Sequence, residues 1–398
     1  MKTALVLSGG GARAAYQVGV LKAVSELLPG QVASPFSVLC GTSSGALNAT
    51  RLACHSENFA GSVHALELLW SELSSKQVHR VGYTHLVGSV LRLLVSFFRH
   101  GKPGGRPLSL LDNTPLREML EQHIDLHRLE PLMSEGHLHA LCISALGYSS
   151  GSNLFFFQGE EDIQSWNASA RIGVRCKLTF DHIMASMALP TIFPAVKINR
   201  EYFGDGALRQ TAPLSAALHL GAKKLFVIGV AGGAGRTPER ELAVHSPTLA
   251  QVMGQLINSA FIDSLAEDMI MLKRFNRFAE CMTTEQREKL HVKPVDLLVI
   301  EPTVKFDQLA SEYARYLPKS MQRLLSITGA NLSRNSNLAS YILFEKEYCM
   351  ELIRCGYVDA MKQESAILDF FDDSADAPMQ NKLIFAEQHH PQTRMSVN

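Results

Sequence analysis

The chain has 398 residues, of which 46% are hydrophobic, and its 38 basic residues balance its 38 acidic ones. This composition excludes an intrinsically disordered protein, and the zero net charge excludes a global electrostatic attraction to nucleic acid. The seven scattered cysteines include no C-x-x-C pair, so neither a zinc site nor a disulfide framework is indicated, and a reducing compartment is favoured.

The first predicted elements are a buried strand at 3–7 and a helix at 12–28, joined by a glycine-rich turn. Three glycines of this turn, Gly9, Gly10 and Gly11, expose backbone N–H groups with no side chains in the way. Such amides could form an oxyanion hole, cradle a phosphate or simply make a tight turn. The stretch completes neither the Walker pattern nor the dinucleotide pattern G-x-G-x-x-G, which weakens the phosphate interpretation.

A second apolar run at 36–40 predicts another strand, and a helix is predicted at 46–54. The residues between them read G-T-S-S-G, the G-x-S-x-G frame of a nucleophile elbow, with Ser43 at its centre. Gly41 and Gly45 would let the chain turn sharply, although an ordinary Gly/Ser turn gives the same pattern. The two strands belong to one βαβ unit and should therefore be parallel. We expect Ser43 and the glycine turn at the same edge of the sheet.

The most apolar helix is predicted at 81–98, next to a Gly-rich loop at 101–107. It is hydrophobic nearly all round, so it is either buried in the core or in contact with lipid. No run of eighteen apolar residues occurs, and the apolar run at 3–7 is too short for a secretion signal. We therefore expect a soluble, cytoplasmic protein, with transient contact of 81–98 with a membrane surface as a hypothesis.

Strands and helices alternate through the middle of the chain, which predicts a layered α/β domain. The helices are predicted at 59–73, 116–122, 180–187 and 213–220, and the strands at 138–146, 154–157, 196–198, 201–203 and 225–230. Asp205 lies between two glycines on a loop after the last hairpin, where its carboxylate could serve as a base for a serine. The alternative without a catalytic role is an ordinary Asp-Gly turn. None of the fifteen histidines lies in a recognisable catalytic frame.

From about residue 246 the alternation of strands and helices gives way to a mainly helical pattern. A long helix is predicted at 249–278, a last strand at 295–300 and several helices across 308–361. Residues 372–398 are polar and aperiodic, and we expect a disordered tail there.

Four stretches in this order resemble the motifs of the patatin-like phospholipase family over roughly residues 1–235. They are S-G-G-G-A-R at 8–13, G-T-S-S-G at 41–45, A-S-M-A-L-P at 185–190 and D-G-A at 205–207. Residues 246–361 resemble, more loosely, the C-terminal helical extension of bacterial members. The resemblance implies a three-layer α/β/α sandwich with a mostly parallel central sheet at 1–303, followed by a helical C-terminal extension at 304–371.

The same resemblance implies an activity and a site. Ser43 would be the nucleophile, Asp205 the base, and Gly9 to Gly11 the oxyanion loop, with Arg13, Gly41, Gly45 and Gly206 supporting it. The substrate would be a phospholipid or lysophospholipid, and neither a metal nor another cofactor would be required. One departure is Ala14, where the family has a glycine; it removes no backbone donor.

Two alternatives to lipid hydrolysis remain open at this point. The same acyl-enzyme could pass its acyl group to an alcohol instead of water, which would make the protein an acyltransferase. A regulatory protein could instead use the pocket only to hold an acyl chain. The intact Ser43, Asp205 and triglycine turn argue against the second alternative. Oligomeric state cannot be read from the sequence.

Overall fold

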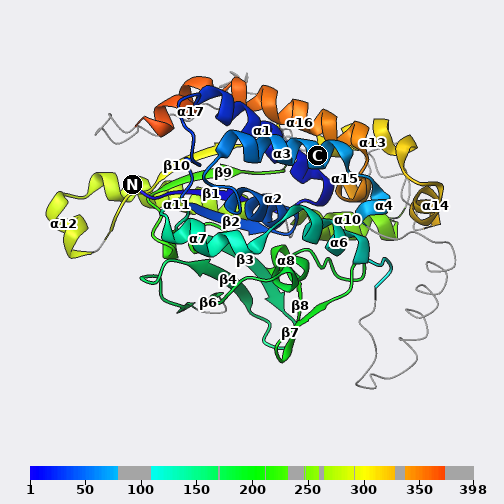
Figure 1. Cartoon of the computed structure of the whole chain (residues 1–398), viewed down its shortest axis with the longest axis horizontal. Coiled ribbons are helices and arrows are strands. Elements are labelled where there is room, and N and C mark those ends of the chain that lie inside the picture. Colours follow the sequence, from blue (N-terminus) through cyan, green and yellow to red (C-terminus); the bar gives the residue numbers. More distant parts are fainter. Residues whose placement is uncertain are drawn as a thin grey trace, which may run out of the picture.

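The computed structural model describes residues 1–78, 109–168, 171–210, 212–231, 246, 248–259, 264–290, 292–327 and 337–372 (Figure 1). The helix predicted at 81–98 and the loop at 101–107 lie outside these residues, as does the predicted tail after residue 372. Within the described ranges, no helix is both long and apolar enough to cross a bilayer.

The described strands form one ten-stranded sheet with the order β10-β9-β1-β2-β3-β4-β6-β5; β8 pairs with β3, and β7 pairs with β8. Neighbours from β10 to β3 are parallel, which places the loops after these strands at one edge. The strands are β1 Thr3–Leu7, β2 Val38–Thr42, β3 Ala140–Gly147, β4 Asn153–Gly159, β5 Trp166–Ala168, β6 Arg171–Arg175, β7 Val196–Ile198, β8 Glu201–Asp205, β9 Lys224–Ile228 and β10 Asp296–Ile300.

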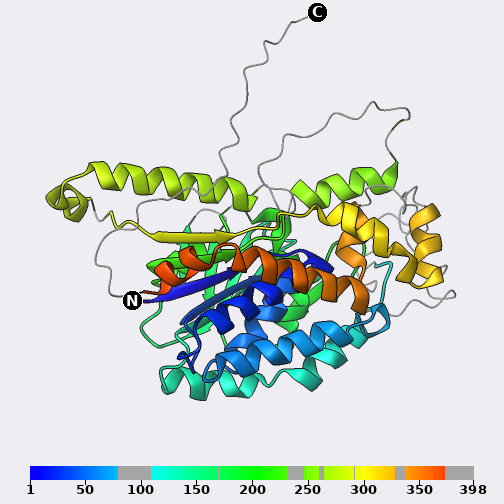
Figure 2. The ribbon, with the colours of Figure 1, turned by 90° about the horizontal axis from the view of Figure 1, so that it is seen from above.

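Helices cover both faces of this sheet, so the chain folds as an α/β/α sandwich with a helical C-terminal region (Figure 2). One face packs against α1 Ala15–Leu27, α2 Ser44–Ala53, α3 Phe59–Glu72, α8 Phe180–Ser186, α16 Lys346–Met361 and α17 Glu364–Phe371. The other packs against α9 Ser215–His219 and α11 Ser264–Cys281. The remaining helices are α4 Ser75–Val78, α6 Thr114–His123, α7 Leu129–Ser134, α10 Leu249–Asn258, α12 Thr284–Lys289, α13 Phe306–Tyr313, α14 Lys319–Ile327 and α15 Asn337–Ile342.

One edge of β3 is shared by two strands that run toward each other. β2 pairs in parallel with the first part of β3, where Thr42 lies opposite Ser144. β8 pairs antiparallel with the last part, where Asp205 lies opposite Ala145. Since β4 pairs with β3 over 140–146 and occupies its other edge, β2 and β8 must take the same edge. Their ends therefore meet, and Asp205 is delivered to the point where the chain leaves β2.

The C-terminal helix α16 packs against α1 at very short range (Figures 1 and 2). A Cβ added to Gly19 of α1 would collide with the backbone carbonyl of Ile353, and one added to Gly356 of α16 would collide with that of Tyr16. The two glycines thus remove the side chains that would hold the helices apart. The helical C-terminal region shares one hydrophobic core with the N-terminal βαβ unit.

Some predicted boundaries are wrong. The strand predicted at 36–40 begins at Val38 and runs to Thr42; Phe36 is apolar because it packs edge-on against Phe59 and Phe226 in the core. Of the helix predicted at 249–278, the structure describes α10 at 249–258 and α11 at 264–281, so the helical segment ends three residues later than predicted. Asp205 is the last residue of β8 and not part of a loop. Six short strands and α-helices among the described residues were not predicted: β5, β6, α4, α7, α12 and α17.

Replacement of Gly19 by alanine should lower the free energy of unfolding by about 1–3 kcal/mol. Alanine favours a helix by up to about 1 kcal/mol over glycine, but the obstructing atoms are backbone and cannot rotate away. Chemical denaturation measures the change. Gly30→Ala is the control, because nothing lies within 4 Å of its added Cβ. Equal effects of the two substitutions would contradict the close crossing.

Candidate active site

Ser43 and Asp205 are joined by a direct hydrogen bond. The Ser43 hydroxyl donates to Asp205 Oδ2 at 2.6 Å, which leaves no room for a histidine ring between them. Ser43 is 6% exposed and Asp205 is fully buried. This direct contact is what a serine paired with a carboxylate base requires. The chemical roles of the two residues remain predictions.

The backbone at Ser43 is strained, with φ 54° and ψ −127° between the end of β2 and the start of α2. A Cβ on Gly41 would lie 2.5 Å from the Cα of Ala46, and one on Gly45 would press against the carbonyls of Leu7 and Ser8. Both glycines are therefore needed where the sequence predicted a sharp turn. This is the local geometry of a nucleophile elbow, which holds a serine hydroxyl clear of its own strand and helix.

Ser186 holds this elbow from α8. Its hydroxyl oxygen accepts a hydrogen bond of 2.8 Å from the backbone N–H of Ser43, and its side chain is fully buried. Ser186 belongs to the A-S-M-A-L-P stretch that the sequence analysis singled out without a role. The hydrogen bond gives that stretch one: it fixes the strained peptide that carries Ser43.

Burial raises the pKa of the Asp205 carboxyl to about 7, and hydrogen bonds from the Ser43 hydroxyl and the Ala207 amide lower it only in part. The Ala207 N–H donates to Oδ1 at 3.0 Å, so the two carboxylate oxygens have different partners. A Cβ on Gly206 would overlap Ser144, which explains the glycine after Asp205. Asp205 is thus a stronger base than an ordinary aspartate.

The glycine turn lies beside the elbow because β1 and β2 are parallel neighbours, with Leu7 opposite Gly41. Gly11 has φ +56°, a conformation that glycine adopts at little cost. An added Cβ there would run into the carbonyl of Tyr341, and one on Gly10 would lie 2.5 Å from Val230. Gly9, Gly10 and Gly11 are therefore next to the elbow, as the βαβ topology predicts.

A model of the patatin-like phospholipase family matches residues 5–218, slightly more than half of the chain. The chain belongs to this family. It is 29% identical over 217 residues to a cGAMP-activated phospholipase from Pseudomonas aeruginosa, and the match covers 54% of this chain and 55% of that protein. The chain thus aligns with about half the length of this curated relative.

Two solved structures are similar in fold at low sequence identity. Human GIVD cytosolic phospholipase A2, solved with methyl γ-linolenyl fluorophosphonate, is 13% identical with a TM-score of 0.42, covering 93% of this chain and 58% of that one. VipD from Legionella pneumophila is 13% identical with a TM-score of 0.35, covering 92% and 67%.

The patatin-like domain also contains a buried series of polar side chains that was not predicted from the sequence. The Trp70 indole donates to Asn48 Oδ1 at 2.8 Å, the Asn48 amide donates to Gln17 Oε1 at 2.9 Å, and the Gln17 amide donates to the Ser8 carbonyl at 2.8 Å. Asn48 and Gln17 are fully buried. These hydrogen bonds link α3 and α2 to Ser8, the residue that precedes the glycine turn. Polar residues amid apolar helix faces were the only available signal.

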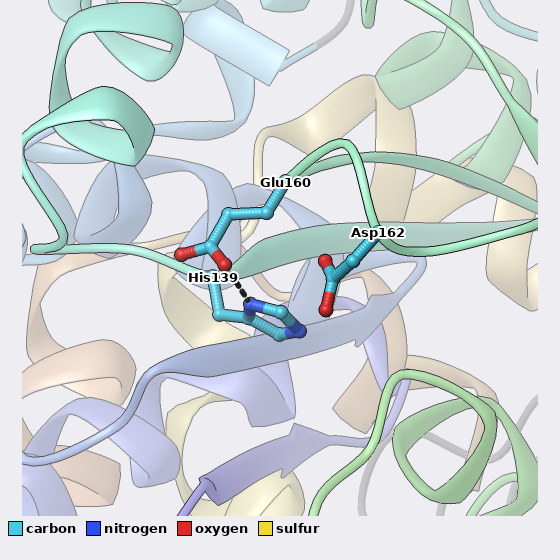
Figure 3. A group of neighbouring side chains, drawn as sticks. All are labelled: His139, Glu160 and Asp162. Carbon is cyan, nitrogen blue, oxygen red and sulfur yellow. Dashed lines mark ion pairs between the residues drawn. The ribbon is translucent and has the colours of Figure 1, made fainter.

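One group among the described residues has the spacing of metal ligands, and it lies at the other end of the strands. Figure 3 shows His139, Glu160 and Asp162, whose potential ligand atoms lie within 4.8 Å of one another. Glu160 pairs with His139 Nδ1 at 2.9 Å, and the Lys2 ammonium lies 2.8 Å from His139 Nε2 and 3.9 Å from Asp162. Because Lys2 supplies a positive charge to these side chains, they form a salt-bridge cluster at this end of the strands.

Asp205→Asn should remove a pH dependence of stability. The folded pKa of about 7 lies above the ordinary 3.8, so the folded state binds this proton more tightly and the wild-type protein loses stability as pH rises from about 4 to 7. Three pKa units correspond to roughly 4 kcal/mol. The amide does not titrate, so this loss is absent from the variant. As pH rises across this window, the Tm of the variant should therefore increase relative to that of the wild type.

Thermal unfolding of both proteins between about pH 5 and 8 measures this difference. Asp369→Asn, at an exposed position of α17, is the control and should follow the wild type at every pH. A Tm difference between Asp205→Asn and wild type that does not change with pH would contradict the raised pKa.

Proposed function

We propose that this protein is a serine lipid acyl hydrolase of the phospholipase A or lysophospholipase type, acting through a Ser43–Asp205 dyad. Membership of the patatin-like phospholipase family supports lipid ester hydrolysis in general. The observation that carries the finer proposal is the 2.6 Å hydrogen bond from the hydroxyl on a strained elbow to a fully buried carboxylate.

In the first half of the reaction, Ser43 Oγ attacks the ester carbonyl carbon while its proton moves to Asp205. The charge that develops on the carbonyl oxygen is stabilised by backbone amides of Gly9 to Gly11. Collapse of the tetrahedral intermediate breaks the ester bond, and the protonated Asp205 returns the proton to the departing alcohol. Ser43 then carries the acyl group.

In the second half, water attacks the acyl-enzyme, with Asp205 accepting its proton. The fatty acid leaves, and the proton returns to Ser43. An ordinary aspartate is a weak base for these steps, with a pKa of about 3.9. Burial raises the pKa of Asp205 to about 7, which makes it a better proton acceptor at neutral pH without a histidine.

We further propose that the substrate is presented at a membrane surface, because phospholipids reside in bilayers. The relative from Pseudomonas aeruginosa is called a cGAMP-activated phospholipase. Activity is therefore best assayed with and without cGAMP, so that a requirement for an activator is not mistaken for absence of the dyad.

Ser43→Ala should abolish hydrolysis of phospholipid vesicles and of a soluble short-chain ester, a loss of several orders of magnitude. The same substitution should abolish labelling by a fluorophosphonate, which bonds covalently to an activated serine. Ser44→Ala is the matched control: Ser44 is adjacent and buried, and its hydroxyl has no hydrogen-bond partner among the described residues. It should keep most of the activity. Loss of activity in Ser44→Ala but not in Ser43→Ala would show that Ser43 is not the nucleophile.

The value of kcat/KM should rise with pH through an apparent pKa near 7, because Asp205 must be ionised to accept the Ser43 proton. Asp205→Asn should reduce turnover nearly as far as Ser43→Ala. Measurement of initial rates with the soluble ester over about pH 5–9 tests both expectations. A rate that stays flat between about pH 5 and 8 would show that another group is the base.

A further inference from the structure

Arg13 is a buried cation held by neutral groups. Its side chain is 3% exposed. Its Nε and Nη2 donate to Ser340 Oγ at 2.9 and 2.7 Å, and its Nη1 donates to the Tyr341 hydroxyl at 3.1 Å. The guanidinium carbon lies 4.0 Å from the centroid of the Tyr341 ring. No described carboxylate pairs with Arg13, so two residues of α15 provide the groups that offset the cost of burying this charge.

Tyr341 also reaches the glycine turn itself, through its own backbone. The Tyr341 carbonyl occupies the place where a side chain on Gly11 would lie. The Arg13 amide donates to the Gly10 carbonyl at 3.1 Å, which closes the turn at the start of the short 3-10 helix Gly11–Ala14. Ser340 and Tyr341 therefore fix both the side chain that follows the turn and the backbone of the turn itself.

This contact joins parts of the chain that are 327 residues apart. Ser340 is fully buried, and the Tyr341 hydroxyl donates to Asn258 Oδ1 of α10 at 2.7 Å. The hydroxyl thus stands between Arg13 on one side and α10 on the other. Helix α15 therefore reaches the glycine turn, and α10 bonds to α15. Both helices lie outside the residues 5–218 that match the family.

We propose that Ser340 and Tyr341 are positioning residues for the hydrolysis reaction, because they clamp Arg13 and Gly11 and so set the direction of the glycine-turn amides. The inference rests on the proposed role of that turn as an oxyanion hole. Oxyanion donors act only when they point at the oxygen of the transition state, and a misplacement of about 1 Å can cost about 100-fold in rate. On this view the C-terminal region is part of the catalytic unit.

The test uses Ser340→Ala and Tyr341→Phe in the full chain, assayed with the soluble short-chain ester. Each variant should lose about 10- to 100-fold in kcat with little change in KM, because an oxyanion hole stabilises the transition state more than bound substrate. The rate of fluorophosphonate labelling should fall with kcat. The apparent pKa near 7 in the pH profile should stay in place, since Ser43 and Asp205 are untouched.

Ser340→Thr retains the hydroxyl and should recover most of the kcat lost in Ser340→Ala. Ser311→Ala is the matched control: this serine is also in the C-terminal region, but among the described residues its hydroxyl bonds only to the Gln308 carbonyl in α13. Its kcat should equal that of the wild type. If Ser340→Ala does not fold, Tyr341→Phe, which keeps the ring and the carbonyl, decides the question.

Unchanged kcat within twofold in folded Ser340→Ala or Tyr341→Phe would overturn the inference while leaving the hydrolase proposal intact. A shifted or lost pH limb in these variants would also overturn it, because the damage would then have reached the dyad. If the wild-type protein neither hydrolyses esters nor is labelled at Ser43, the proposed function itself fails, and the inference fails with it.

Discussion

The structure depends on how one edge of β3 is divided. β2 uses the first part of this edge and β8 the last part, and the two strands approach from opposite directions. The chain leaves β2 at Ser43 and reaches the end of β8 at Asp205, so backbone pairing alone brings the two residues together. The glycine turn joins them because β1 is the parallel neighbour of β2. Three segments from distant parts of the sequence thereby meet without any loop having to reach across the sheet.

The position at the end of β8 also sets the chemistry of Asp205. Enclosure between β3 and α8 excludes water, and this desolvation raises the pKa of the carboxyl to about 7. The same enclosure makes the ionised form of Asp205 costly for folding. The left-handed backbone at Ser43 is a second, separate cost. The fold offsets these local costs with buried hydrogen bonds, including that from the Ser43 amide to Ser186 and the Trp70–Asn48–Gln17 chain. Stability is thus given up at Ser43 and Asp205 and recovered around them.

Much of this site could be predicted from the sequence, since local patterns carry it. The G-x-S-x-G frame, the triglycine turn and the βαβ order place Ser43 beside the turn before any coordinates are known. The pairing of Asp205 with β3 could not be predicted, because a strand as short as β8 is specified by its partner rather than by its own residues. The contact of Arg13 with Ser340 was equally hidden: it spans 327 residues and leaves no local pattern. Phe36 shows the converse error, where a residue buried for tertiary reasons resembles part of a strand.

The close packing of α1 and α16 has a consequence for biosynthesis. Tyr16 in α1 bonds to Asp359 in α16, which is 343 residues later. At about 5–20 residues per second, the ribosome delivers that partner roughly 20–70 s after Tyr16. Until then the α1 surface around Gly19 lacks the helix α16 that covers it in the folded protein. During that interval the emerging chain exposes apolar surface of the kind that makes incompletely folded chains prone to aggregation.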